Sequence, residues 1–134
     1  MVPLAQADVL RVEGAWTRAS IGTSRPAAAY FNIVNGSATG DRLIAIGSEV
    51  ADAATVHRTV SHDDVIRMES IGSLPIPAGA TVRLAPGGLH VMLMDLKRPL
   101  TKGMSVTLSL TFERAGLVEV TAVVAGIGAT APPQ

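Results

Sequence analysis

The chain has 134 residues, in which 11 Lys and Arg balance 11 Asp and Glu, and it contains no Cys. With balanced charge, the chain lacks the excess of positive residues that is typical of proteins that bind nucleic acid or an anionic membrane surface. The lack of Cys excludes disulfides, zinc–thiolate sites, blue copper centres and cysteine catalysis. Hydrophobic residues make up 48% of the chain but aromatic residues only 3%, so we expect a single domain with an aliphatic core.

The two ends of the chain lack the patterning of the rest. Residues 1–7 include Ala5-Gln6-Ala7, which is similar to the end of an export signal. We interpret residues 1–7 as a flexible N-terminus, either the remnant of a removed signal or a cloning scar, with a simple disordered start as the alternative. Residues 8–126 form the predicted domain, and residues 127–134 a flexible tail. No apolar run approaches the ~18 residues that a membrane-spanning helix needs.

Most segments of the predicted domain alternate apolar and polar residues or carry β-branched runs, which is typical of strands. The predicted strands are residues 9–15, 28–34, 42–46, 55–60, 65–71, 80–84, 89–96, 105–112 and 118–124. Turn residues separate them, most clearly in the polar turn 61–64, the proline-rich turn 74–79 and the hairpin turn 113–116. Only residues 48–54 suggest a helical turn. The pattern predicts an all-β fold, a single-domain antiparallel β-sandwich.

His57, Met68, His90 and Met92 form two local pairs. If strand 55–60 pairs with strand 65–71 about the centre of the turn 61–64, His57 lies directly opposite Met68, with Cβ atoms roughly 5 Å apart. His90 and Met92 are two positions apart in one strand, so they point to the same side of it. The sequence alone does not determine whether the two pairs meet.

Imidazole and thioether donors, in a chain without thiols, suit soft copper(I) better than other biological metals. We therefore predict one copper(I) per chain, held by these two pairs. Each residue taken singly has a plainer interpretation, because a Met in a β-protein usually fills the core. We expect this core role for Met94 and Met104, and an exposed position for His62 in its polar turn.

The spacing His57, Met68, His90, Met92 reads H-x10-M-x21-H-x-M. With this spacing the chain resembles the periplasmic copper chaperone family PCu(A)C, whose signature has the same gaps. The resemblance extends to the stretches LPIPAG (74–79), LAPGG (84–88), HVMLM (90–94) and LKRPL (96–100). It covers roughly residues 10–125, most of the chain.

The resemblance implies a cupredoxin-like Greek key fold and a copper(I) metallochaperone, not an enzyme, that is exported to the periplasm or another extracytoplasmic site. It further implies copper delivery for the copper A centre of cytochrome c oxidase, through its subunit II or a Sco-type protein. We expect a monomer with no nucleic-acid partner and no membrane span.

Some members of the family carry a second copper(II) site in a His- and Met-rich tail, and residues 127–134 contain neither residue. Two alternatives remain for the function. One is a β-sandwich interaction module without metal, which a metal-binding assay would separate from the chaperone. The other is an electron-transfer cupredoxin, which the missing Cys disfavours.

Overall fold

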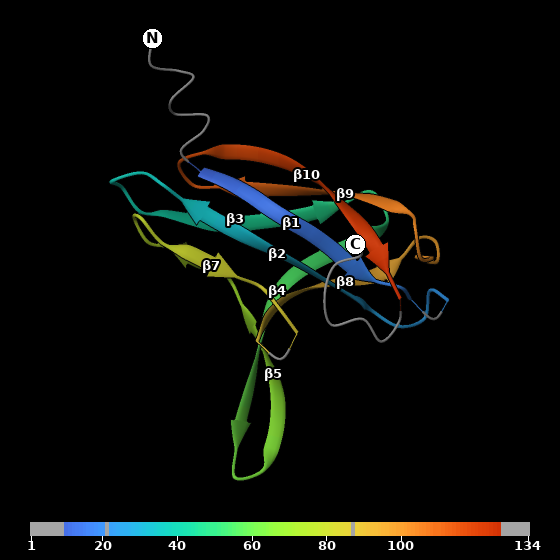
Figure 1. The fold of residues 1–134 in the computed structure, drawn as a ribbon. Helices are drawn as coiled ribbons and strands as arrows, with labels where there is room; N and C mark the ends of the chain where they lie inside the picture. Colours follow the sequence, from blue (N-terminus) through green and yellow to red (C-terminus); the bar gives the residue numbers. More distant parts are fainter. Residues whose placement is uncertain (1–9, 21, 87, 127–134) are drawn as a thin grey trace.

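The computed structural model describes residues 10–20, 22–86 and 88–126, and these form a sheet of ten strands (Figure 1). The strands are β1 (Leu10–Arg18), β2 (Ala27–Asn35), β3 (Asp41–Ser48), β4 (Ala51–His62), β5 (Val65–Ile71), β6 (Leu74–Ile76), β7 (Thr81–Arg83), β8 (Leu89–Leu96), β9 (Ser105–Phe112) and β10 (Gly116–Ala125). The predictions for residues 1–7 and 127–134 lie outside the described residues.

The strands pair in the order β5-β4-β8-β2-β1-β10-β9-β3-β6, with β7 added beside β2. A further pairing, between Ser48 and Ala51, joins β3 to β4, so the path from β4 round to β3 returns to its start. All pairs are antiparallel except β1 and β10, which run parallel. The strands therefore enclose an interior between opposite parts of the sheet, and the predicted all-β sandwich is confirmed.

The larger of the two core clusters is aliphatic with two Phe side chains, and the smaller one consists of Trp16, Tyr30 and Ala125. The fully buried members of the larger cluster come from strands on opposite parts of the sheet, since it contains Phe31 of β2, Leu93 of β8, and Leu108 and Phe112 of β9. Burial alternates along β8, where Val91 and Leu93 face the core and their neighbours Met92 and Met94 are only partly buried. The intervening residues of β8 therefore lie on the outer surface of the sheet.

Two predicted local elements are wrong. Residues 48–54 form no helical turn, because β3 ends at Ser48 and β4 begins at Ala51, and the two strands are joined by a short turn. The proline-rich stretch includes a strand as well as a turn, since Leu74–Ile76 pairs with β3. Residues 51–54 pair with β8 and residues 74–76 pair with β3, and both partner strands are distant in the sequence. Local strand propensity does not indicate such partners.

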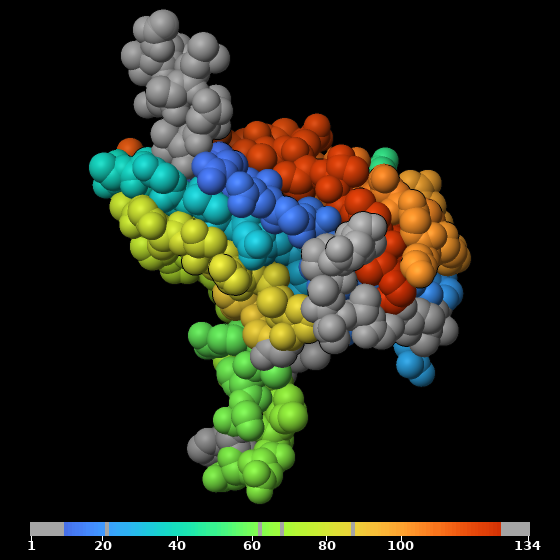
Figure 2. Space-filling view, in the orientation of Figure 1, coloured from blue at the N-terminus to red at the C-terminus, as the bar shows by residue number. Residues whose placement is uncertain are grey.

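The β4–β5 hairpin extends away from the body of the molecule (Figures 1 and 2). Its pairing continues to His62 and Val65, so the turn contains only Asp63 and Asp64. Both have positive φ, 51° and 65°. This is the backbone of a two-residue type I′ turn, which matches the twist of the flanking strands. Because β8 pairs with β4 only as far as Arg58, the outer half of the hairpin is a two-stranded ribbon.

No helix in the described part of the chain could cross a membrane.

Candidate metal centre

His57 and His90 face each other from neighbouring strands. They are direct partners in the antiparallel β4–β8 ladder. Their rings are stacked, with centroids 5.9 Å apart and planes inclined by 24°. His90 is only 4% exposed and His57 is partly buried. The structure thus brings together one residue from each of the two pairs that the sequence singled out.

The ring of His90 is held by the backbone of the loop that precedes it. Its Nδ1 lies 3.1 Å from the carbonyl oxygen of Gly88. A carbonyl oxygen can only accept, so Nδ1 carries the proton and a neutral ring has its lone pair on Nε2. That Nε2 atom is buried and has no hydrogen-bond partner among the described residues.

The ring of His57 is held by a side chain of its own strand. Its Nε2 lies 2.8 Å from Oγ1 of Thr55, two residues earlier in β4. Its other nitrogen, Nδ1, is buried and has no hydrogen-bond partner within the described structure. Each of the two facing imidazoles therefore has one nitrogen engaged by the protein and one nitrogen left over.

Buried polar atoms in proteins nearly always have a partner, so two unpartnered nitrogens on facing rings call for an explanation. A metal ion bound between the rings would accept a lone pair from each of these two nitrogens. Metal-bound imidazoles characteristically engage their second nitrogen in a hydrogen bond, as both rings do here. The donor arrangement therefore fits a metal ion. In the described residues, no cluster of three or more His, Cys, Asp or Glu side chains is placed to hold one.

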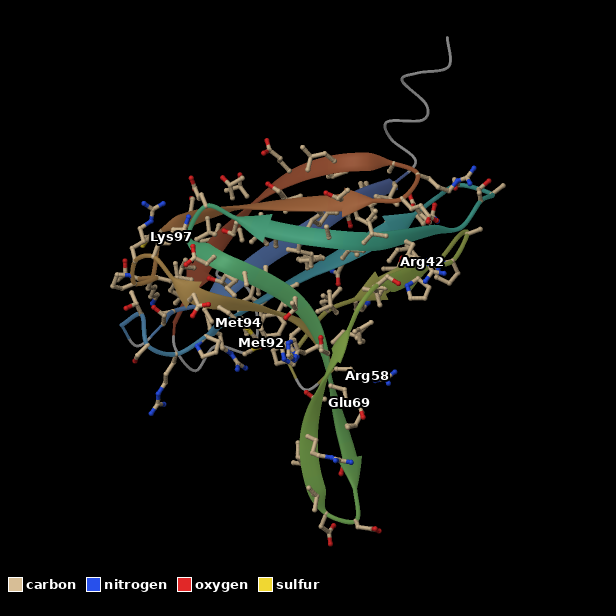
Figure 3. The ribbon with its side chains drawn as sticks, turned by 180° about the vertical axis from the view of Figure 1, so that it is seen from behind. Arg42, Arg58, Glu69, Met92, Met94 and Lys97 are labelled. Atoms are coloured by element: carbon tan, nitrogen blue, oxygen red, sulfur yellow. The ribbon has the colours of Figure 1, made fainter. Side chains whose placement is uncertain are left out.

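Met92 adds a thioether beside the two imidazoles. It pairs with Thr55 across the β4–β8 ladder, one step along the same face from the His57–His90 pair. On its other side β8 pairs with β2, where Met92 is opposite Ala28. Figure 3 labels Met92 and, two positions further on, Met94.

Met94 does not occupy the predicted core position. It is partly buried and pairs with Ala53, and the core cluster contains its neighbour Leu93 instead. Met104, by contrast, packs against the core cluster as predicted. The error with Met94 arose because a run of apolar residues conceals which alternate positions face inward.

The predicted direct opposition of His57 and Met68 is wrong. The tight two-residue turn moves the hairpin register by two residues, so Met68 pairs with Thr59 and His57 pairs with Ser70. A shift of two residues preserves strand parity, whereas a shift of one would reverse it. Positions 57 and 68 therefore remain diagonal neighbours in the ladder. The side chains of Met68 and His62 lie outside what the structure describes, and the backbone of His62 belongs to β4, not to the turn.

The environment of His57 favours the neutral imidazole. Burial lowers the pKa of His57 below its ordinary value of 6.5, and the neighbouring His90 lowers it further. A neutral ring is the form that can bind a metal ion.

Two supporting groups were not predicted from the sequence, the hydroxyl of Thr55 and the carbonyl of Gly88. A Thr two positions before a His in a strand lies on the same face, so this spacing could have indicated the first contact. No sequence signal indicates the second, because the loop conformation decides where a backbone carbonyl points.

Comparisons with known proteins show the family to which the chain belongs. The family model described as "LpqE-like: Putative lipoprotein LpqE-like" matches residues 10–124. A curated relative, "Putative lipoprotein Lxx21020" of Leifsonia xyli subsp. xyli, is 36% identical over 111 residues, which is 82% of this chain and 66% of the relative. The chain thus spans slightly less than two thirds of that relative's length.

Among solved structures, the apo PCuAC domain of PmoF2 matches with a TM-score of 0.76 and 28% identity, covering 92% of this chain and 94% of that domain. The copper-bound PCuAC domain of PmoF2 matches with a TM-score of 0.75 and 28% identity, over 88% of this chain and 93% of that domain. The copper(I) form of DR1885 from Deinococcus radiodurans matches with a TM-score of 0.65 and 31% identity, over 92% of this chain and 87% of that protein.

Proposed function

The chain belongs to the LpqE-like family, and from that premise we propose that it is a copper(I) metallochaperone that works outside the cytoplasm. Its cargo is one copper(I) ion per chain, bound by His57, Met68, His90 and Met92. The observation that carries the proposal is the pair of facing imidazoles, each with one buried nitrogen that has no partner among the described residues. The likeness to the copper-bound PCuAC domain of PmoF2 and to the copper(I) form of DR1885 supports copper as the ion.

The donor set suits copper(I) for chemical reasons. The ion is soft and imposes little geometric preference, so two imidazoles and two thioethers can surround it. Copper(II) prefers harder donors in a tetragonal arrangement, so the same set favours the reduced ion. Because the chain has no Cys, disulfide formation cannot destroy the site in an oxidising compartment.

Neutral donors also suit release of the cargo. Thioethers bind copper(I) less strongly than thiolates, so an incoming partner can replace them one at a time. The strands that carry the proposed ligands are held unequally, since His90 lies on β8, which pairs on both sides, whereas Met68 lies on β5, which pairs only with β4. The projecting hairpin in Figure 2 gives a partner access to the strand that carries Met68. We infer that Met68 is the first ligand to leave and His90 the last.

The recipient follows from the resemblance to the PCu(A)C family. We assign the role of copper delivery for the copper A centre of cytochrome c oxidase, to subunit II directly or through a Sco-type protein. The curated relative is described as a lipoprotein, which supports a location outside the cytoplasm, periplasmic or otherwise exported. We propose that the protein does this as a monomeric carrier and not as an enzyme.

Anaerobic titration with copper(I), followed by NMR of the Met methyl and His ring signals, tests the proposal. We expect saturation at one equivalent, with shifts at His57, Met68, His90 and Met92, and X-ray absorption showing both nitrogen and sulfur donors. Saturation without any shift of the Met68 and Met92 methyl signals would refute the ligand set. Absence of binding would refute the function.

A further inference from the structure

Thr55 contacts the proposed site but is not one of its ligands. Its Oγ1 is 2.8 Å from His57 Nε2, and its strand position is opposite Met92. It is partly buried on the face of β4 that carries His57. Its hydroxyl therefore contacts the proposed ligand His57, and its backbone pairs with that of the proposed ligand Met92.

The hydrogen bond has two possible proton arrangements. If Thr55 donates to Nε2, the proton of His57 is on Nδ1, where it would be a buried donor without a partner among the described residues. If His57 donates from Nε2 to Oγ1, the lone pair is on Nδ1 and is ready to bind a metal ion. An unpartnered buried N–H is among the least tolerated groups in a protein, which favours the second arrangement.

We propose that Thr55 is a positioning residue, whose hydroxyl accepts the Nε2 proton of His57 and thereby presents Nδ1 to copper(I). His90, held by the Gly88 carbonyl at Nδ1, presents Nε2. The two imidazoles thus bind through different nitrogens, and two different acceptors set their tautomers. This inference rests on the proposed function, because it names the support and the atoms of that same site.

The energetic reason is preorganisation of a metal ligand. A hydrogen bond to the second nitrogen fixes the ring orientation and makes the ligating nitrogen more basic. Loss of such a support typically lowers metal affinity by about 10–100-fold. Valine has nearly the same shape as threonine and a high strand propensity, so Thr55→Val removes the acceptor with little effect on the fold.

The first experiment is performed on the metal-free protein. Long-range proton–nitrogen NMR correlations within the imidazole ring show which nitrogen of His57 carries the proton. We expect the Nε2–H form in the wild type and in Thr55→Ser, and a mixture of tautomers in Thr55→Val. A predominant Nδ1–H form in the wild type would overturn the proposal, whether or not the protein binds copper.

The second experiment measures copper(I) affinity by competition with a chromophoric chelator. We expect Thr55→Val to weaken binding by about tenfold or more and Thr55→Ser to remain near the wild type. Thr121→Val makes the same chemical change at an exposed position of β10 and should leave the affinity unchanged. Equal affinities for the wild type and Thr55→Val would overturn the positioning role while leaving the copper function intact. A wild type that does not bind copper would refute the function itself, and the tautomer measurement would still decide the role of Thr55.

Discussion

His57 and His90 are direct cross-strand partners, and their stacked rings connect β4 to β8 on the outer surface of the sheet. This contact joins two segments that the sequence presents as separate local pairs. It also places a ring from the strand of the projecting hairpin against a ring from the body of the sandwich. A metal ion bound between them would link the hairpin to the body, so copper loading should restrict the hairpin.

Met92 and Met94 form a matched pair for testing the ligand set. Both are partly buried on the same face of β8, and Leu has nearly the volume of Met. We expect Met92→Leu to reduce copper(I) affinity strongly and Met94→Leu to leave it unchanged, as measured by chelator competition. Each substitution should alter the free energy of unfolding by less than about 1.5 kcal/mol. Loss of binding in Met94→Leu alone would show that the ligand on β8 has been misassigned.

The lowered pKa of His57 predicts a pH dependence of folding in the metal-free protein. In the unfolded chain His57 takes up a proton near its ordinary pKa of ~6.5, whereas the folded chain resists protonation until a lower pH. Between these two values the unfolded state binds more protons, so stability rises with pH and is lost as pH falls below ~6.5. Denaturant unfolding measured across this range should show the loss, and His57→Gln should reduce it. An unchanged profile in His57→Gln would contradict the assignment.

Copper binding should also respond to pH, because protons compete with the ion for the two imidazoles while thioethers do not titrate. We expect affinity to fall below roughly pH 6. A constant affinity between about pH 7.5 and 5 would indicate a site made of Met alone.

Thr17 offers a test of the core. Its side chain is 0% exposed, and its hydroxyl has no hydrogen-bond partner among the described residues. A buried hydroxyl without a partner carries an uncompensated desolvation cost. Thr17→Val should therefore raise the free energy of unfolding by about 1 kcal/mol, measured by urea denaturation. The exposed Thr121→Val serves as the control, and a destabilised Thr17→Val would mean that the hydroxyl has a partner.

The Asp63-Asp64 turn predicts opposite effects for two substitutions at one position. Asp64 has φ of 65°, a region that glycine adopts freely and a β-branched residue adopts only with strain. Asp64→Gly should protect the amides of β4 and β5 against hydrogen exchange, and Asp64→Val should reduce that protection by about 1–2 kcal/mol. Similar protection in both variants would show that the turn does not limit hairpin stability.

Most of the strands could be predicted from the sequence, and so could the hairpin formed by β9 and β10. Alternation along 105–112 and 118–124 is a property of neighbouring residues, and both strands were found with the turn between them. The period of two also placed His90 and Met92 on one side of β8, because that relation needs no partner strand. The spacing of the four proposed ligands was likewise visible without a structure, through a family resemblance and not through physics.

Which strands become neighbours in the sheet depends on the fold as a whole. Nothing local determines that β4 pairs with β8, so the meeting of His57 and His90 could not be derived. The two-residue turn shifted Met68 from His57 to Thr59, because register depends on turn geometry as well as on pattern. The outward position of Met94 depends on which face of β8 the rest of the sandwich covers, and the direction of the Gly88 carbonyl depends on the conformation of its loop. Alternation is encoded residue by residue, whereas strand order and register result from the free energy of the whole sheet.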